Sequence, residues 1–499
     1  MITFDNVREW IEEARKFGEL NVIEGADPHV EVGAIDQINC KNEGPALLFT
    51  NLKDHDNGFR ILTSHLANIR LVNFTFGLPI EYSIQETIGS LRMKIGEWAQ
   101  NAKNFPIKVV DTGPILENIE EGDHVDLNKF PVPLWHELDG GKFIGTADGV
   151  ITRDPDTGDL NMGTYRVQLH DGQTLGNAIS PGKHGRMHRD KYFKKGQPCP
   201  VVMIFGHDPL NFTLACHEIP TGIFELDYLG AIRGESVPII AGKVTGLPIP
   251  ANAEIAIEGF VYPEETLPEG PFGEWPGTYN TVSQIGARKR EMPFVRVAAL
   301  YYRNDAVLLG APPAKGMYSS HGFIRSIWRS AILHNEIDKS GIPNVEGVFC
   351  PAFGGSRLFT IVSIKQSYAG HATEVGHVAS QTRAGAYVGR YVVVVDEDIN
   401  PYDIEDVMWA ICTRSDPLEI DFIKRAWASG VDPRIKKPAE YFTPMAPKLH
   451  FHNTRGIIYA VKPIEWYQEF PMTNVASEEL RKQMFSKWAA KMKDRWKVI

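Results

Sequence analysis

Cysteine is scarce in this sequence, and the few cysteines form no recognisable pattern. The 499 residues contain five of them, far apart and without a Cys-x-x-Cys pair: Cys40, Cys199, Cys216, Cys350 and Cys412. A disulfide framework and a zinc ribbon both depend on closely spaced or paired cysteines. Neither is indicated, and we expect free thiols in a reducing compartment.

Long apolar runs and an excess of positive charge are also lacking. No apolar run approaches the roughly 20 residues that span a bilayer, and the first residues lack the basic and apolar segments of a signal peptide. The formal net charge is -10, whereas nucleic-acid binding needs Lys and Arg concentrated on one face. We therefore expect a cytoplasmic protein that binds neither membranes nor nucleic acids.

Several common motifs are absent as well. The sequence has no G-x-G-x-x-G run that opens a helix, no Walker loop, no Gly-x-Ser-x-Gly elbow and no His-Glu-x-x-His motif. Their absence argues against the commonest dinucleotide, nucleotide, hydrolase and zinc-protease interpretations.

The chain is longer than the size at which a single core stops growing, so we expect several domains. Near the N-terminus, Asp5 or Asn6 can cap a first amphipathic helix, residues 44–49 indicate a buried strand, and residues 84–99 indicate a second helix. From about 145 to 309 strand follows strand, apart from a helix near 184–195, which predicts a β-rich, barrel-like domain. Beyond Pro312 helices and strands alternate again, and residues 391–395 are apolar throughout, like a strand covered on both faces.

We divide the chain into an N-terminal α/β domain at 1–115, a central β-rich domain at 116–310, a C-terminal α/β domain at 311–470 and a C-terminal helix at 471–499. The last helix is predicted to begin after Ser477, and its apolar residues recur every four positions: Leu480, Met484, Trp488 and Met492. This stripe needs a partner, which is either the body of its own subunit or a second subunit. We expect a homo-oligomer.

Residues 268–274, Pro-Glu-Gly-Pro-Phe-Gly-Glu, hold two carboxylates, Glu269 and Glu274. Alternation from 254 to 261 predicts a strand that leads into this run, and the Pro and Gly content predicts that both acids lie on a fixed loop. Neighbouring carboxylates suit general acid–base catalysis because their charges separate their pKa values. A solvated surface turn is the other interpretation, and spacing alone does not decide between the two.

Asn161, His184 and Glu225 offer an amide oxygen, an imidazole and a carboxylate, a set that suits Mn²⁺ or Mg²⁺ better than zinc. His188 and His217 are equally available, and His184 is also explained as a surface residue.

The strand that contains Asn161 also contains Gly163, which indicates a bulge or the close approach of a ligand. Asn161 and Arg166 are an odd number of positions apart, so a regular strand sends them to opposite faces. Both can serve one site only if the strand breaks, and we predict this break near Gly163.

Taken together, these segments resemble the UbiD family of decarboxylases, which use prenylated flavin mononucleotide (prenylated FMN). The resemblance covers nearly the whole chain and is carried by motifs in the family's order: residues 44–49, 130–133, 161–166, 181–184, 224–225, 268–274, 393–398 and 409–411. It implies an α/β (α+β) fold with a central flavin-binding domain like a split β-barrel between α/β segments. It also implies a C-terminal oligomerisation region and thus a homodimer or homohexamer.

The resemblance implies roles for individual residues. Asn161, His184 and Glu225 match the family's ligands for a divalent metal, usually Mn²⁺, which links the flavin phosphate to the protein beside K⁺. Arg166, Glu269 and Glu274 match its Glu-Arg-Glu catalytic set. The further cofactor residues implied are Met162, Gly163, Thr164, Tyr165, Lys183 and Arg383, and those of the potassium site are Met162, Ala215, His217 and Glu225, mainly through backbone oxygens.

The reaction implied is the reversible, non-oxidative decarboxylation of an aromatic or heteroaromatic acid, with release of CO2. Loss of CO2 from an sp² carbon leaves an unstabilised carbanion, so an electron sink is needed that no side chain provides. In the mechanism that the family suggests, the substrate bonds covalently to prenylated FMN and Glu274 protonates the adduct. Arg166 holds the substrate carboxylate or pairs with Glu269, and Glu274, being less paired, carries the proton.

The sequence leaves the substrate and two alternatives open. Trp275 either stacks on an aromatic acid or merely packs the loop, and Ser180, His321 and Phe323 are further candidates for the substrate pocket. An α,β-unsaturated acid of the acrylic or cinnamic type is an alternative substrate. A flavin-binding or carrier protein without turnover is an alternative of another class, although it would lack the acid pair. The family also implies that a separate flavin prenyltransferase supplies the cofactor.

Overall fold

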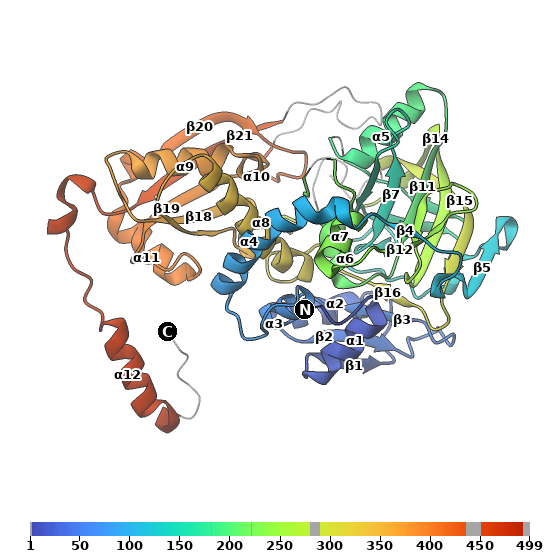
Figure 1. The fold of residues 1–499 in the computed structure, drawn as a ribbon, viewed down its shortest axis with the longest axis horizontal. Coiled ribbons are helices and arrows are strands. Elements are labelled where there is room, and N and C mark those ends of the chain that lie inside the picture. The colour runs from blue at the N-terminus through green and yellow to red at the C-terminus, as the bar shows by residue number, and fades with distance from the viewer. Residues whose placement is uncertain (1, 181, 221, 280–289, 436–450, 493–499) are drawn as a thin grey trace.

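The computed structural model describes residues 2–180, 182–220, 222–279, 290–435 and 451–492. Pro181 of the family motifs and residues 493–499 of the predicted terminal segment lie outside this described part. The fold is mixed α/β, and its long central sheet curls into half a barrel, as predicted (Figure 1). All five cysteines are free, which also agrees with the sequence.

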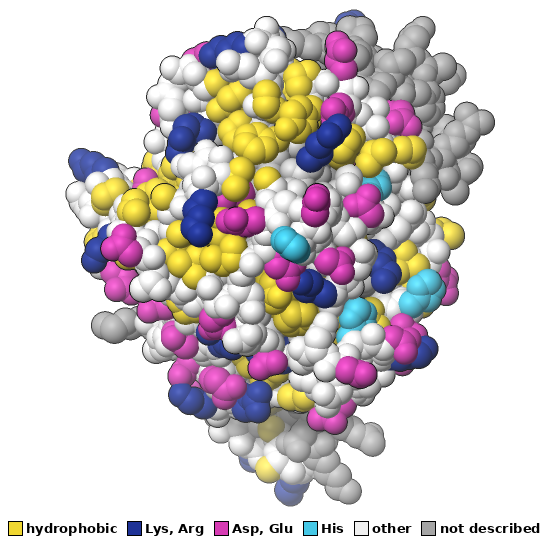
Figure 2. Space-filling view, turned by 90° about the vertical axis from the view of Figure 1, so that its right-hand side faces the viewer, with side chains coloured by type: hydrophobic (Ala, Val, Ile, Leu, Met, Phe, Trp, Pro, Cys, Tyr) yellow, Lys and Arg dark blue, Asp and Glu magenta, His cyan; other side chains and the backbone are white. Residues whose placement is uncertain are grey.

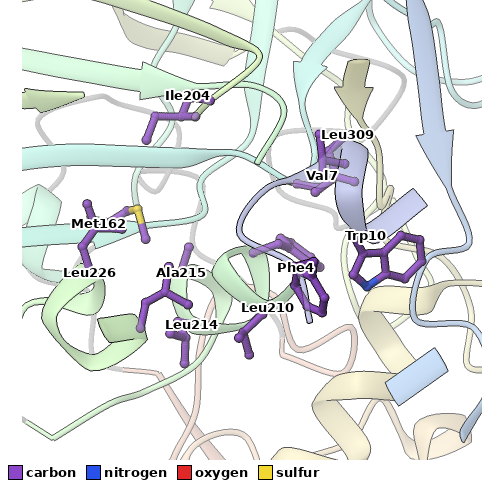
Figure 3. Packing of buried hydrophobic residues seen from close by; sticks show 14 of the residues in the cluster. Phe4, Val7, Trp10, Met162, Ile204, Leu210, Leu214, Ala215, Leu226 and Leu309 are labelled. Atoms are coloured by element: carbon purple, nitrogen blue, oxygen red, sulfur yellow. The ribbon is translucent and has the colours of Figure 1, made fainter. Parts of the chain in front are cut away.

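The N-terminal sheet takes its last strand from far along the chain. Its order is β1 (Leu20–Glu24), β2 (Ala46–Thr50), β3 (Arg60–Thr63) and β16 (Val307–Leu309). The helices of this region are α1 (Val7–Lys16), α2 (Glu31–Lys41) and α3 (Ile69–Thr75). Asn6 caps α1, and Val7 and Trp10 of this helix are buried in one hydrophobic core with Leu309 of β16 (Figure 3).

The central sheet contains the strands that lead into the candidate site. Its order is β6-β9-β10-β15-β14-β11-β7-β8, with β5 paired to β15. The strands are β5 (Asn118–Glu121), β6 (Phe143–Gly145), β7 (Gly149–Arg153), β8 (Leu160–Gly163), β9 (Val167–Asp171), β10 (Thr174–Gly176), β11 (Cys199–Ile204), β14 (Ile255–Glu269) and β15 (Arg290–Tyr302). A small sheet beside it joins β13 (Pro248–Pro250), β12 (Pro238–Ala241) and β4 (Lys108–Val109).

The central region contains more helix than the sequence predicted. The expected helix is α5 (His184–Lys194), but α6 (Pro209–Cys216) and α7 (Glu225–Arg233) were not anticipated. Every residue of α6 from Pro209 to Ala215 is buried. A helix buried on all sides leaves no amphipathic 3.6-residue period to detect, which explains why α6 was missed.

The C-terminal sheet has the order β17 (Val345–Phe349), β18 (Phe359–Ile364), β19 (Tyr391–Asp396), β21 (His452–Ala460) and β20 (Asp421–Trp427). Its helices are α8 (Ser320–Lys339), α9 (His371–Gln381), α10 (Arg383–Ala386) and α11 (Ile404–Arg414). Residues 392–395 of β19 are buried, as predicted for a strand covered on both faces, whereas Tyr391 at its start is 47% exposed. The long helix α4 (Ile84–Asn101) packs against α8 and so joins the N-terminal and C-terminal parts (Figure 1).

The terminal helix α12 (Glu478–Trp488) begins after Ser477, as predicted, and stands clear of the body in Figure 1. Leu480 is 44% exposed and Met492 36%, so the apolar stripe is not buried by the described part of its own subunit.

Among the described helices, none is both long and apolar enough to cross a membrane. The face of the central region in Figure 2 mixes acidic and basic side chains, without a large patch of one sign. The domain limits stay predictions.

Candidate active site

The centre of the site is Arg166, which bridges the two acids of residues 268–274. Its Nε donates a hydrogen bond to Glu269 Oε1 at 2.7 Å, and its Nη1 donates one to Glu274 Oε1 at 2.9 Å. Burial opposes the guanidinium charge, but Glu269 and Glu274 outweigh it and raise the pKa of Arg166. The expectation that Glu274 is less paired with Arg166 than Glu269 is thus wrong, because one guanidinium has enough N–H donors for both carboxylates.

The two acids differ in burial rather than in pairing. The Glu269 side chain is 0% exposed, and its Oε2 is buried with no hydrogen-bond partner in the described part of the chain. The Glu274 side chain is 20% exposed. Glu274 is therefore the carboxylate that a small molecule reaches more easily.

The end of β14 positions Glu269. The strand continues through Pro268 to Glu269, which pairs with Arg290 of β15, so Glu269 ends a strand and does not lie on a loop as predicted. The register of β14 shifts between Val261 and Thr266, and such an irregularity lets a strand continue into a segment rich in proline. The loop itself begins at Gly270, whose N–H donates to Gln168 Oε1 at 2.9 Å.

The strand structure is interrupted between β8 and β9, and the Arg166 side chain in this interruption points toward the two acids. β8 ends at Gly163 and β9 begins at Val167, which confirms the predicted break. The structure adds a reason for the glycine. A Cβ on Gly163 would lie 2.5 Å from the Tyr165 hydroxyl oxygen, so the glycine makes room for Tyr165. The approach of a ligand at this position stays a prediction.

Close backbone approaches complete the support of the acids, and sequence reasoning missed them. A Cβ on Gly176 would lie 2.7 Å from Glu269 Oε2, and one on Gly140 would lie 1.7 Å from the Gly270 carbonyl oxygen. The guanidinium carbon of Arg166 also lies 5.6 Å from the centre of the Phe272 ring. No motif marks such approaches, because the segments that meet are far apart in the sequence.

The three candidate metal ligands come from separate elements and lie together. Asn161 of β8 and Glu225 of α7 are buried, whereas His184, the first residue of α5, is exposed. Asn161 Oδ1 lies 3.1 Å from His184 Nδ1, and Glu225 Oε2 accepts a hydrogen bond from the Met162 N–H at 2.6 Å.

The chemistry of this set fits a hard cation. Burial raises the pKa of Glu225 to about 8, as expected for a carboxylate that lacks a nearby positive charge. Asn161 Nδ2 is buried without a hydrogen-bond partner among the described residues. No three His, Cys, Asp or Glu side chains are grouped for a metal in the described ranges, but this set has only two such side chains and an asparagine, a combination suited to Mn²⁺ or Mg²⁺.

Of the residues assigned to the potassium site, Glu225 belongs to the metal set and Met162 contacts it through its backbone N–H. The side chains of Met162 and Ala215 belong to the hydrophobic core (Figure 3). The Ala215 carbonyl accepts a hydrogen bond from the Thr164 N–H at 2.9 Å. His217 Nδ1 lies 2.6 Å from the Thr213 carbonyl oxygen, and burial lowers the pKa of this imidazole to about 3.

The structure groups some of the predicted substrate residues and separates others. A small cavity is lined by Trp275, Pro313, Ala314, Gly316, Ser319, His321, Gly322, Arg325, Ala352 and Gly355. Phe323 lies on the same helix as His321 but is buried in the hydrophobic core, and Ser180 is exposed. The Arg383 guanidinium lies over Trp427, 4.7 Å from the ring centre.

Sequence reasoning also missed the arginines beside this cavity, Arg325, Arg329 and Arg357. His321, Arg325 and Arg329 recur every four positions in α8, a spacing that places them on one face of a helix. That spacing is a usable signal, but the helix had not been predicted. Arg357 precedes β18 and has no local signal of this kind.

Models of one protein family match most of the chain. They describe the N-terminal, Rift-related and C-terminal domains of 3-octaprenyl-4-hydroxybenzoate carboxy-lyase (UbiD) and match residues 11–91, 108–316 and 322–452. A pyrrole-2-carboxylic acid decarboxylase from Pseudomonas aeruginosa is 30% identical over 438 residues, which cover 83% of this chain and 84% of that protein.

Solved structures of UbiD-class enzymes share the fold. The enzyme HmfF from Pelotomaculum thermopropionicum, in complex with FMN, has a TM-score of 0.81 and 25% identity, covering 97% of this chain and 100% of the other. An evolved dimeric form of HmfF, in complex with prFMN, has a TM-score of 0.77 and 25% identity, covering 96% and 98%.

The approach of Gly176 to Glu269 generates a prediction. Gly176→Ala places a Cβ closer to Glu269 Oε2 than van der Waals contact allows, so we expect the carboxylate to move and its hydrogen bond to Arg166 to lengthen. A crystal structure of the variant measures this distance. Gly89→Ala in α4, where a Cβ meets nothing within 4 Å, is the control. An unchanged Arg166–Glu269 distance in Gly176→Ala would contradict the prediction.

Proposed function

The chain belongs to the UbiD family of carboxy-lyases, and on this premise we propose that it reversibly decarboxylates an aromatic or heteroaromatic carboxylic acid with prenylated FMN. The observation that carries the proposal is the Arg166 side chain, which bridges Glu269 and Glu274 in the interior. The similarity to a pyrrole-2-carboxylic acid decarboxylase supports a heteroaromatic or aromatic substrate. The flavin complexes of HmfF support a flavin cofactor.

The cofactor and its metal account for the second group of side chains. Prenylated FMN, when bound, supplies the covalent electron sink that decarboxylation at an sp² carbon requires. Asn161, His184 and Glu225 would hold a divalent cation, Mn²⁺ by preference, against the flavin phosphate. Met162 and Ala215 would contribute backbone oxygens to a K⁺ beside it. A separate flavin prenyltransferase supplies this cofactor.

The two acids have different roles in the proton transfer. The bond between the ring and the carboxylate breaks, its electron pair stays with the ring carbon, and a proton from Glu274 takes the place of CO2. Glu269 keeps its hydrogen bond to Arg166 Nε, so Glu274 can be protonated without leaving the buried guanidinium unpaired. The greater exposure of Glu274 lets it exchange its proton with the substrate and with water.

The exposed stripe of α12 supports a homo-oligomer, a homodimer or homohexamer, in which α12 packs on a neighbouring subunit. Leu480 and Met492 expose apolar surface that a second subunit would cover.

A hydrogen-exchange experiment tests the reaction class. Holoenzyme is incubated in D2O with high bicarbonate and the decarboxylated products of a panel of aromatic, heteroaromatic and cinnamic-type acids. Because the reaction is reversible, we expect deuterium to replace hydrogen at the carbon that carries the carboxylate in the corresponding acid, and mass spectrometry detects it. The absence of exchange on every member, with prenylated FMN shown to be bound, would contradict the proposal.

Glu274→Gln tests the proton donor. The amide preserves shape and a hydrogen bond to Arg166 but has no proton to transfer, so we expect kcat to fall about 100- to 10,000-fold. Flavin and metal content should match the wild type, as measured by absorbance and elemental analysis. Glu264→Gln, an exposed residue of the same strand, is the control. Wild-type turnover in Glu274→Gln would exclude this assignment.

His184→Ala tests the metal set. Removing the imidazole takes away one of three ligands, so we expect loss of the divalent metal and, with it, of the flavin. Elemental analysis and the flavin absorbance of purified protein measure both. The control is His124→Ala, which removes an exposed imidazole far along the sequence. Full metal and flavin content in His184→Ala would refute the assignment.

A further inference from the structure

A group of cations beside the acid pair contains arginines without a role in the reaction proposed above. We call Lys183, Arg325, Arg329 and Arg357 the cationic cluster. Glu218 pairs with two of them, with Arg329 Nη2 at 3.2 Å and with Arg357 Nη2 at 3.4 Å. Desolvation alone would raise the pKa of Glu218, but Arg357, Arg329 and Lys183 outweigh it and hold that pKa well below its usual range. Within the described residues, Glu218 is thus the carboxylate that forms ion pairs with this cluster of four cations, and it pairs with two of them.

The arginines of the cluster are buried with donors unused. The side chains of Arg329 and Arg357 are 7% and 8% exposed, and Arg325 is 9% exposed. Burial, together with Arg329 and Arg325, lowers the pKa of Arg357 to about 9. Arg325 Nε and Arg357 Nη1 are buried with no hydrogen-bond partner in the described part of the chain. Buried guanidinium groups with unpaired N–H donors indicate a binding site for an anion, which would accept these hydrogen bonds and balance the positive charge.

The contacts distinguish Arg329 from Arg325 and Arg357, although Arg329 Nε is also buried without a hydrogen-bond partner among the described residues, and Arg357 shares Glu218 with Arg329. Arg329 donates to Glu218 and to the Ala384 carbonyl oxygen, and so ties α8 to α10. Arg325 donates to His321 Nε2, and this ring is neutral because burial and Arg325 hold its pKa well below the usual value. The hydrogen-bond partner of Arg325 therefore leaves its charge uncompensated, and Arg325 lines the cavity.

Trp275 connects the cluster to the acid pair. Its ring centre lies 5.8 Å from the guanidinium carbons of both Arg325 and Arg357. A Cβ on Gly355 would lie 2.9 Å from the ring, so the indole is packed firmly in place. Trp275 directly follows Glu274, whose carboxylate lies on Arg166. Arg325 and Arg357 therefore contact the residue that directly follows Glu274.

Resting on the proposed decarboxylase function, we propose that the substrate is an aromatic dicarboxylate, whose second carboxylate is bound by Arg325 and Arg357 beside Trp275. The planar fork of an arginine matches a carboxylate in a bidentate manner. The ring of such a substrate lies along Trp275, and its second carboxylate brings the negative charge that the cluster lacks. A flavin phosphate has the same donor chemistry, but it already has a candidate site at Asn161, His184 and Glu225, whereas Arg325 and Arg357 flank Trp275.

Matched substrates test the proposal on the holoenzyme. The kcat/KM for decarboxylation is measured with pyrrole-2,5-dicarboxylate and pyrrole-2-carboxylate, and with terephthalate and benzoate. In the wild type we expect the dicarboxylate of at least one pair to be preferred about 10- to 100-fold, the range that one charge-assisted bidentate contact supports. Arg325→Met, which keeps an unbranched apolar side chain and removes the charged guanidinium, should reduce this ratio about 10- to 100-fold at wild-type flavin content.

Two further variants guard against misfolding and general charge effects. Arg325→Lys keeps the charge without the fork and should retain part of the preference. Lys339→Met removes an exposed positive charge from the same helix and should leave the ratio as in the wild type. If Arg325→Met does not fold, Arg357→Met should show the loss of preference instead.

Calorimetric titration of the holoenzyme with the same acids separates this inference from the proposed function. Binding of a dicarboxylate that weakens at least about 10-fold in Arg325→Met supports the inference even if no acid is turned over. Turnover of monocarboxylates and dicarboxylates with equal kcat/KM, unchanged by Arg325→Met, would overturn it while the decarboxylase function stands. Loss of flavin from Arg325→Met and Arg325→Lys would also overturn it, because the cluster would then bind the cofactor phosphate.

Discussion

One buried guanidinium shared by two carboxylates is the interaction on which the site depends. Arg166 lies where the chain leaves β8, Glu269 ends β14, and Glu274 follows on the loop. An uncompensated charge in the interior costs several kcal/mol, so these segments hold one another in place. Close packing around these segments also explains two glycines: a Cβ on Gly176 would collide with the Glu269 carboxylate, and one on Gly140 with the Gly270 carbonyl oxygen.

The charges on the two sides of Trp275 have opposite balance. Toward the central sheet, two carboxylates share one arginine, and toward α8, Glu218 pairs with only two members of the cationic cluster, Arg329 and Arg357. A preorganised field of this kind orients an anionic ring without further movement of the protein. In the binding mode that we propose, the second carboxylate of the substrate lies on the cationic side and the reacting carbon lies near Glu274.

Helix α8 links this site to the rest of the molecule. Its length places His321 and Arg325 at the cavity, while Arg329 further along reaches Glu218 and the Ala384 carbonyl oxygen of α10. α4 packs against the same helix. A shift of α8 would therefore alter the position of the cationic cluster relative to Glu274, and packing from both terminal regions opposes such a shift.

The sequence by itself determined the features that depend on local pattern or on short motifs. The period of α1, the apolar run of β19, the end of β8 at Gly163 and the start of α12 after Ser477 were all predictable. The residue pattern itself indicated Glu269 and Glu274 and offered Asn161, His184 and Glu225 as metal ligands, and the family resemblance joined Arg166 to the acids and assigned the roles. It could not supply their geometry.

Only the tertiary structure decided which charges meet. Arg166 and Glu269 are 103 positions apart, and Arg329 and Glu218 are 111 apart. Whether such residues touch depends on strand order and helix packing, which no local period encodes. For this reason the sequence could not show that Arg166 holds both acids, that Glu269 ends a strand, or that Arg325 and Arg357 converge on Trp275. These long-range ion pairs and ring contacts are the physical basis of the site's charge and of the substrate we infer from it.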